Sequence, residues 1–377
     1  MSQSFIPYGR QLIEDDDIEA VVAVLRGDWL TTGPTVGRFE AAFAAYTGAA
    51  HAIAVSNGTA ALHLAAIAAG LGPGDEVIVP ALTFAASANC ARYVGAKVVF
   101  ADVRADTLTI DTAHVASLIT PHTRAIVTVD YAGLPSDLDE IMALADRHRL
   151  LVIEDACHAL GAEYRQRKIG SIAHLSTFSF HPVKHLTSGE GGMVTTNDAA
   201  LADRIRKLRN HGIETDHRQR EQQGTWQYDM RELGYNYRLT DIQAAVGREQ
   251  LKRLPEIIAR RRAIAARFRE LLSEIEGIAL PLEPDNVHSN WQSYCVRLPG
   301  HVDQRDVMQS MLDAGVSTRR GIMCSHREEP YLTARRSGSL SHSESAQDHC
   351  MVLPLYGQMT DDDVIKVATA LRAAVNS

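Results

Sequence analysis

The sequence lacks the long apolar run that a membrane protein would show. None of its 377 residues lies in an uninterrupted apolar stretch of about 18 residues, the length that a membrane-spanning helix requires. The N-terminus, MSQSFIPYGRQLIEDDD, becomes acidic where a secretory signal peptide would be apolar. We therefore expect a soluble protein of the cytoplasm, with no membrane partner.

Cysteine and positive charge are also scarce. The five cysteines form no CxxC pair, so we expect free thiols in a reducing compartment and no zinc or other metal site. The net charge is -8, and the one basic run, Arg260 to Arg262, falls in a segment that reads as an exposed helix. Because proteins that bind nucleic acid concentrate basic charge on one face, we expect no nucleic-acid partner.

Short apolar runs alternate with longer amphipathic stretches between about residues 50 and 200. Unbroken apolar strands separated by helices indicate an α/β fold, in which a mainly parallel sheet is sandwiched by helices. Ligands bind such sheets at the carboxyl ends of the strands. The expected strands are 76–79, 97–100, 124–129 and 150–153, and the expected helices include 59–70 and 137–149.

The pattern changes after residue 240, where a smaller α+β domain is expected. A long helical pattern begins near Thr240 and Asp241, a plausible N-cap. The Ser-rich patch 336–345 (RSGSLSHSES) predicts a mobile loop. The further elements expected are a helix over 240–273, a strand over 291–298, a helix over 303–314 and a terminal helix from about 361.

One of the six lysines stands apart from the others. Lys184 follows the strand-like run LSTFSF in a polar, Gly-rich segment that also holds Ser179 and His181. This setting suits a desolvated amine whose lowered pKa favours Schiff-base chemistry. Asp155 ends a predicted strand, where an α/β protein places its ligand, although an aspartate there can also simply cap a loop. The remaining lysines read as surface residues: Lys97, Lys168, Lys207, Lys252 and Lys366.

Pyridoxal 5'-phosphate (PLP) needs a lysine, a carboxylate for its pyridine nitrogen, a phosphate cradle and a stacking partner. The turn at 56–59 (SNGT) precedes a predicted helix, whose N-terminal N–H groups and dipole favour a phosphate. Phe84 could stack on the ring, and Ser179 could donate to the phosphate. His158 could pack over the ring or bond its phenolic oxygen. Each feature alone also has an ordinary structural explanation, but their order along the chain predicts a PLP site.

The sequence resembles the DegT-type sugar aminotransferases, a branch of the aspartate-aminotransferase superfamily with PLP fold type I. The resemblance covers nearly the whole chain, through IPYGRQLIEDDDIEAV, LTTGPTV, SNGTAALH, EDACHALGA, SFHPVKHLTSGEGG, GYNYRLTD and LPLYGQMTDDDV. It implies that Lys184 forms the Schiff base with PLP, that Asp155 pairs with the pyridine nitrogen and that His158 contacts the ring. The domains that we expect are an N-terminal arm (1–30), a large PLP-binding domain (31–245) and a small C-terminal domain (246–377).

The resemblance also implies how the phosphate is held and how the chain assembles. Gly58, Thr59 and Ser179 would bind the phosphate from one subunit. Asn236, in GYNYRLTD, would reach it from a second subunit. A homodimer with shared active sites is therefore expected.

The reaction that the resemblance implies is a ping-pong transamination. L-glutamate would convert PLP to the amine form, PMP, which would then aminate a nucleotide-linked keto sugar. Three segments (IPYGRQ, EDACHALGAEY and SFHPVKHL) look closest to enzymes that aminate C4 of UDP-4-keto-6-deoxy-hexosamines, and C3 amination is the alternative. Residues 321–331 depart from the HxxPxH-like pattern of the family, so the substrate contacts that we expect from His326 and Arg319 stay open. His181 is a further substrate-binding candidate.

Three other functions compete with this interpretation. PMP-dependent sugar dehydratases carry histidine at the Schiff-base position, so Lys184 argues against that chemistry. A non-catalytic PLP-binding regulatory protein would not need the complete set of Lys184, Asp155, Ser179 and Asn236. An NAD-dependent sugar oxidoreductase would carry a GxGxxG turn after its first strand, and this sequence has none.

Overall fold

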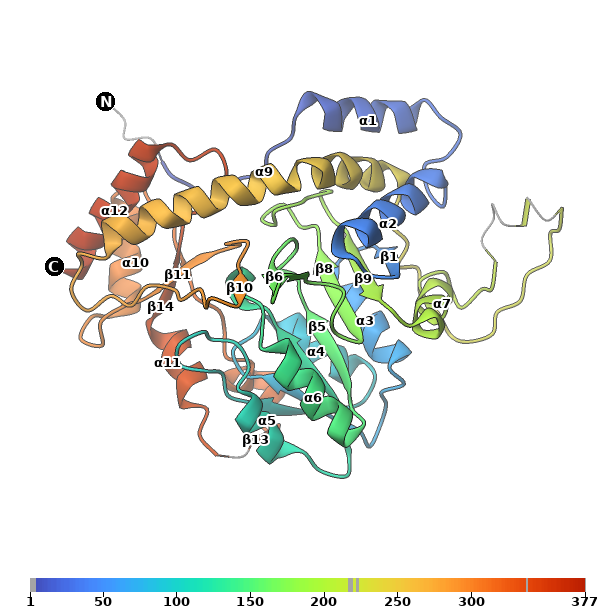
Figure 1. Ribbon diagram of the computed structural model, residues 1–377, viewed down its shortest axis with the longest axis horizontal. Coiled ribbons are helices and arrows are strands. Elements are labelled where there is room, and N and C mark those ends of the chain that lie inside the picture. Colours follow the sequence, from blue (N-terminus) through green and yellow to red (C-terminus); the bar gives the residue numbers. More distant parts are fainter. Residues whose placement is uncertain (1–4, 216–219, 222–223, 337, 377) are drawn as a thin grey trace.

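The computed structural model describes residues 5–215, 220–221, 224–336 and 338–376. Within these ranges, eight strands form one sheet in the order β1-β9-β8-β5-β4-β2-β3-β13 (Figure 1). Strands β13, β3, β2, β4, β5 and β8 pair in parallel, and β9 is antiparallel to both β8 and β1. The strands are β1 (His51–Val55), β2 (Glu76–Pro80), β3 (Lys97–Ala101), β4 (Thr123–Val129), β5 (Leu151–Asp155), β8 (Leu175–Ser179), β9 (Gly192–Thr196) and β13 (Arg335–Arg336).

Helices cover both faces of this sheet because successive strand residues face opposite sides. On β2, Val77 and Val79 pack with α3 (Gly58–Ala68), α4 (Ala85–Tyr93) and α7 (Ala199–Leu208). Ile78 packs on the other face with α5 (Thr112–Leu118) and α6 (Leu138–His148). All three side chains are fully buried, and burial of each stabilises the fold by roughly 1.5–3 kcal/mol. The predicted α/β fold, with a mainly parallel sheet between helices, is confirmed.

The long helix α9 (Asp241–Leu272) connects this sheet to a second one (Figure 1). Thr240 caps it, because its hydroxyl accepts the N–H of Gln243 at 3.2 Å. Leu254 lies in the core of the large sheet, whereas Phe268 lies in a second core with α10 (Gln304–Asp313) and α12 (Asp361–Val375). Helix α9 thus runs through the boundary predicted at 245/246, and the domain limits stay predictions. The second sheet contains β11 (Tyr294–Arg297), β14 (Cys350–Leu353) and β12 (Arg319–Arg320).

The loop predicted over 336–345 is wrong from Ser341 onward, where α11 (Ser341–His349) begins. Asp102, just after β3, caps this helix: Oδ1 accepts the N–H of Ser343 at 2.7 Å and its hydroxyl at 2.6 Å, and Oδ2 accepts the N–H of His342 at 3.0 Å. A carboxylate at a helix N-terminus stabilises the helix. Since this cap comes from a residue more than 200 positions away, the local sequence carries no sign of the helix. Residue 337 of the predicted loop lies outside the described residues.

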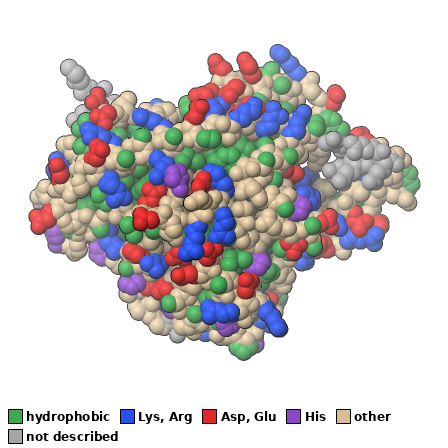
Figure 2. All heavy atoms as spheres, viewed as in Figure 1, with side chains coloured by type: hydrophobic (Ala, Val, Ile, Leu, Met, Phe, Trp, Pro, Cys, Tyr) green, Lys and Arg blue, Asp and Glu red, His purple; other side chains and the backbone are tan. Residues whose placement is uncertain are grey.

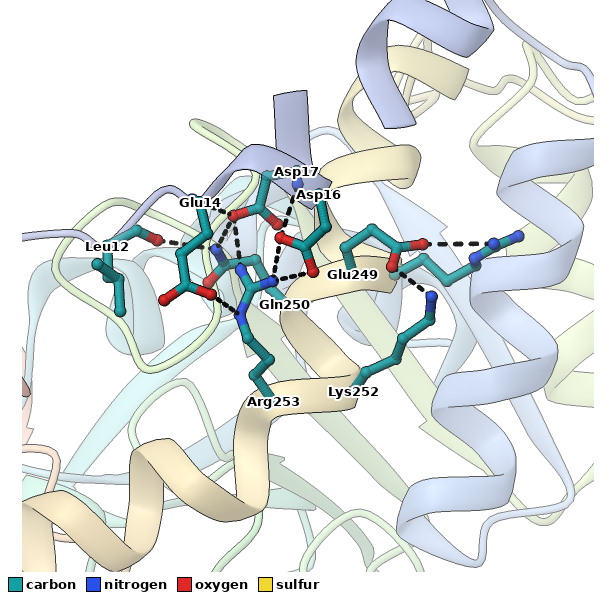
Figure 3. A network of polar contacts seen from close by, with 9 residues as sticks. Leu12, Glu14, Asp16, Asp17, Glu249, Gln250, Lys252 and Arg253 are labelled. Atoms are coloured by element: carbon teal, nitrogen blue, oxygen red, sulfur yellow. Dashed lines mark hydrogen bonds and ion pairs between the residues drawn. The ribbon is translucent and has the colours of Figure 1, made fainter. Parts of the chain in front are cut away.

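The N-terminal arm lies on α9 (Figure 3). Arg253 of α9 pairs with Glu14, Asp16 and Asp17 at the start of α1 (Asp15–Leu25), and Gln250 donates to Asp17 at 2.8 Å. The arm leads to α2 (Pro34–Thr47), which packs on the same helix. A small sheet of β10 (Val287–His288), β6 (Glu163–Tyr164) and β7 (Arg167–Lys168) completes the strands described.

Acidic and basic side chains are interspersed on the face of the molecule that Figure 2 shows. None of the helices that the structure describes is both long enough and apolar enough to cross a lipid bilayer.

Candidate active site

A cavity of about 680 Å³ lies at the carboxyl ends of three neighbouring strands. Val129, Asp155 and Ser179, the last residues of β4, β5 and β8, all line it. This is the edge at which a parallel sheet binds ligands, and the volume suits a small-molecule ligand. The predicted site residues that the structure brings together here are Gly58, Thr59, Phe84, Asp155, His158, Ser179, His181 and Lys184.

Lys184 lies in the turn that follows β8. Burial lowers the pKa of its amine, although the nearby Cys157 and Asp155 raise it. A lowered pKa increases the neutral fraction of the amine, which is the form that attacks a carbonyl carbon. By contrast, Lys168 and Lys207 form ion pairs with Glu163 and Asp203, at 2.8 and 2.7 Å, and do not line the cavity.

Asp155 ends β5 with its carboxylate held from two sides. Ser87 of α4 donates its hydroxyl to Oδ2 at 2.5 Å, and the N–H of Cys157 donates to Oδ1 at 3.2 Å. The residue is 7% exposed, so few water molecules compete for these bonds. The result is an oriented carboxylate at the wall of the cavity, suited to a positively charged or N–H-bearing ligand group.

His158 presents a neutral ring to the same cavity. Burial lowers its pKa well below 6.5, and the nearby charges of Lys184, His185 and Arg261 lower it further. Its Nδ1 atom is buried and has no hydrogen-bond partner among the described residues. A buried polar atom without a partner is costly in a folded protein, so it marks a place where a ligand can bind.

The N-terminus of α3 forms a cradle beside the end of β8. Asn57 caps the helix, since its Oδ1 accepts the N–H of Ala60 at 2.8 Å. The N–H groups of the first turn, at Gly58 and Thr59, have no acceptor within the helix and can bind an anion. A Cβ at Gly58 would lie only 2.9 Å from the Cβ of Ser179, so glycine permits this close approach.

Phe84 and His181 occupy exposed positions on the lining of the cavity. Phe84 is 58% exposed, so it lies on the lining and not in the hydrophobic core. His181 is also exposed, and its carbonyl accepts the N–H of Lys184 at 2.9 Å. Both side chains are therefore accessible to a ligand entering the cavity.

Three predicted site residues lie outside the cavity lining. Asn236 is exposed on the segment that precedes α9, and its neighbour Tyr237 lines the cavity. Arg319 lies over the ring of Tyr8, 5.3 Å from its centroid. His326 is 3% exposed, and its Nε2 lies 2.9 Å from Glu344 Oε1.

The geometry therefore does not support substrate contacts by Arg319 and His326. The segment 321–331 instead reaches the cavity through Ile322, because residues 323 and 324 pair with the chain at 82 and 83. This pairing decides which side chain of the segment faces the cavity. No pattern in the sequence indicates the pairing.

Other lining residues also escaped the sequence-based prediction. Tyr131 lies two residues after the end of β4, so its place just after a predicted strand could have indicated that it lines the site. Thr83 and Ser87 lie on either side of the predicted residue Phe84. Their position in the site depends on the hydrogen bond from Ser87 to Asp155, 68 residues away, and on the bond from Thr83 to Ser87. Cys157 lies between two predicted residues, Asp155 and His158.

Known proteins resemble this chain over almost its full length. The spore coat polysaccharide biosynthesis protein SpsC of Bacillus subtilis is 39% identical over 98% of this chain and 97% of its own. The putative sugar aminotransferase Spr1654 from Streptococcus pneumoniae, in its PMP form, has a TM-score of 0.93 at 28% identity, covering 98% of this chain and 99% of the other. DesV of S. venezuelae, in complex with a ketimine intermediate, has a TM-score of 0.90 at 34% identity and covers all of both chains.

The family-level comparison agrees with these relatives. A model of the DegT/DnrJ/EryC1/StrS aminotransferase family matches residues 11–372. Because this match spans nearly the whole chain and agrees with the relatives above, the chain belongs to the DegT/DnrJ/EryC1/StrS aminotransferase family.

Proposed function

We propose that this protein is a cytoplasmic PLP-dependent aminotransferase of nucleotide-linked keto sugars. It transfers the amino group of L-glutamate to the C4 keto group of a keto-deoxy sugar, such as a UDP-4-keto-6-deoxy-hexosamine. The observation that carries the proposal is the convergence of Lys184 and Asp155, from two strand ends, on one cavity. The likeness to Spr1654, which has been solved with PLP and with PMP, supports the same cofactor here.

The residues of the cavity fit PLP. The Lys184 amine would hold the cofactor covalently, and the Asp155 carboxylate would hold the proton on its pyridine nitrogen. The first turn of α3, with the hydroxyl of Ser179, suits a phosphate. His158 Nδ1 has no hydrogen-bond partner among the described residues, and the phenolic oxygen of PLP would supply one. When bound, PLP supplies an electron sink for the carbanion that forms when Cα loses its proton.

The chain's own groups would then move the protons. With the cofactor bound to the donor's amine, Nζ of Lys184 would be a free base inside the cavity. It would remove the Cα proton of L-glutamate, and in the second half-reaction it would deliver a proton to the sugar carbon that receives the amine. The desolvated position of Lys184 suits both roles, because burial lowers the pKa of the amine and so enlarges its neutral fraction, the form that accepts a proton.

We also propose that the enzyme works as a homodimer in which Asn236 binds the phosphate in the partner's site. The segment before Asn236 belongs to an arm that extends beyond α7 (Figure 1). This arm exposes apolar side chains, including Trp226 at 83% and Leu233 at 77%. Large apolar side chains that are this exposed on one segment indicate an interaction surface, and a second copy of the chain would cover it.

A panel of nucleotide-linked 3-keto and 4-keto sugars, assayed with L-glutamate, tests the reaction. We expect one 2-oxoglutarate for each 4-keto sugar converted to an amino sugar. Amination of the 3-keto sugars alone would move the assignment to C3. Release of deoxygenated sugar with only catalytic consumption of L-glutamate would overturn the aminotransferase proposal.

A further inference from the structure

Three buried side chains form a line of hydrogen bonds that ends on Asp155. Thr83 Oγ1 donates to Ser87 Oγ at 2.8 Å, and Ser87 Oγ donates to Asp155 Oδ2 at 2.5 Å. Thr83 and Ser87 are both fully buried, and Asp155 is nearly so. Water therefore has little access to replace either bond.

The direction of these bonds follows from the hydrogens available. An ionised carboxylate only accepts, so the hydroxyl hydrogen of Ser87 must point to Asp155. The oxygen of Ser87 is then free to accept from Thr83. The alternative acceptor for Thr83, its neighbour's carbonyl at Phe84, lies farther away at 3.3 Å. The two hydroxyl dipoles therefore align toward the carboxylate, and each strengthens the other.

The line is anchored in elements that form the wall of the cavity. Thr83 and Ser87 lie four residues apart at the start of α4, and the N–H of Ser87 donates to the carbonyl of Phe84 at 3.2 Å. The N–H of Thr83 donates to the carbonyl of Met323 at 3.2 Å. The two hydroxyls therefore have a fixed position relative to β5, and a fixed donor restricts the rotation of the Asp155 side chain.

We propose that Ser87, supported by Thr83, is a positioning residue that orients Asp155, so that its carboxylate holds the proton on the cofactor's pyridine nitrogen. This inference rests on the function proposed above. Neither hydroxyl needs to touch the reacting atoms, because both act through Asp155. Hydrogen bonds to an ionised group are stronger than those between neutral groups, so the loss of Ser87 should affect Asp155 more than the fold.

The chain contains a matched control for this bond. Ser176 donates its hydroxyl to Glu154 Oε2, also at 2.5 Å, and both residues are fully buried. Glu154 precedes Asp155 on β5 and faces the opposite side of the sheet, and neither Ser176 nor Glu154 lines the cavity. Ser176→Ala thus removes a buried serine–carboxylate bond of the same length from a carboxylate that does not line the cavity.

The test compares Ser87→Ala, Thr83→Val and Ser176→Ala in the full-length protein reconstituted with PLP. For Ser87→Ala we expect PLP affinity to fall roughly tenfold or more. The pH midpoint of the visible absorbance of the bound cofactor should move upward, because a less protonated ring withdraws fewer electrons from the lysine nitrogen. We expect kcat to fall while KM for L-glutamate changes little. Thr83→Val should shift the same quantities in the same direction, by less.

Two further variants distinguish positioning of Asp155 by Ser87 from a purely structural role of the bond. Ser87→Thr retains the hydroxyl and should restore part of the wild-type midpoint. In the double variant, Thr83→Val should add little to Ser87→Ala, since both act on one line of bonds. If Ser87→Ala lowers the melting temperature as Ser176→Ala does but leaves PLP affinity and the pH midpoint unchanged, the line is structural and the inference is wrong. A wild-type protein that binds no PLP would instead contradict the proposed function.

Discussion

At the scale of single residues, Lys184 carries the most specific prediction. Borohydride should link the cofactor to Lys184, since this is the lysine that lines the cavity. Lys184→Ala should still bind PLP, because the other contacts remain. Its turnover should fall by more than about 10²–10⁴-fold, the contribution of a positioned acid–base group alone. Mass spectrometry of the reduced, digested protein checks the first point, and attachment to another lysine would contradict it.

Lys184→His separates transamination from sugar dehydration. The related PMP-dependent sugar dehydratases carry histidine at the position that corresponds to Lys184. We expect the variant to lose transamination without forming much deoxygenated sugar, because the rest of the cavity is unchanged. Chromatography of the sugar products measures both outcomes, and rapid deoxygenation by the variant would show that this one residue decides the chemistry.

A buried carboxyl pair, Asp130 and Glu154, should make stability depend on pH. Burial raises the pKa of Glu154 to about 7 and that of Asp130 well above its ordinary value. One oxygen of each has no partner among the described residues, so a shared proton can bridge the two groups. In the unfolded chain both groups release their protons near pH 4. Between about pH 4.5 and 7 the folded state therefore binds more protons than the unfolded state, and stability falls as pH rises.

Glu154→Gln tests this pair. The amide can donate to Asp130 at every pH, so the fall in melting temperature between pH 5 and 7 should become shallower, and the variant should gain stability relative to the wild type above pH 7. Glu256→Gln, on the exposed side of α9, should keep the wild-type slope. A wild-type melting temperature that stays constant from pH 5 to 7 would contradict proton sharing.

At the scale of elements, Arg253 should hold α1 on α9. Its guanidinium pairs with three carboxylates, of which Asp17 is 1% exposed (Figure 3). Removing one partner leaves the others uncompensated, so Arg253→Ala should destabilise the protein by roughly 1–3 kcal/mol. Chemical denaturation measures this loss, and limited proteolysis before residue 30 should become faster.

Lys252→Ala is the matched control one position away. Lys252 pairs with Glu249 on the same helix, but its side chain is 59% exposed. Exposed pairs contribute about 0–1 kcal/mol, so the effect should be small. Equal losses in the two variants would show that the contact with α1 adds nothing beyond a surface charge.

At the scale of the whole molecule, the proposal that two subunits share each active site leads to a prediction that a monomer could not meet. Asn236→Ala should weaken PLP retention, and Lys184→Ala should abolish turnover. In mixed dimers of the two variants, one site carries both substitutions and the other carries neither. Mixing should therefore restore part of the wild-type activity. The assay is combined with light scattering to verify the dimer, and verified mixed dimers without activity would contradict shared sites.

The sequence by itself determined four parallel strands of the central sheet and indicated the core of the candidate site. The predicted strands at 76–79, 97–100, 124–129 and 150–153 correspond to β2, β3, β4 and β5. Runs of Val and Ile are a strong signal because these strands are buried on both faces. Asp155 and Lys184 could be placed together because the carboxyl ends of parallel strands meet at one edge.

Tertiary structure alone decided which other side chains face the cavity. Ile322 lines it while His326 turns to Glu344, since the pairing of this segment with residues 82–83 sets its orientation. In the same way, α11 depends on the distant Asp102, and the bond from Ser87 to Asp155 joins α4 to β5. A local pattern shows where a strand or helix can form. Which side chains meet depends on contacts between residues far apart in the chain. The local periodicity of apolar residues in a single sequence does not reveal these contacts.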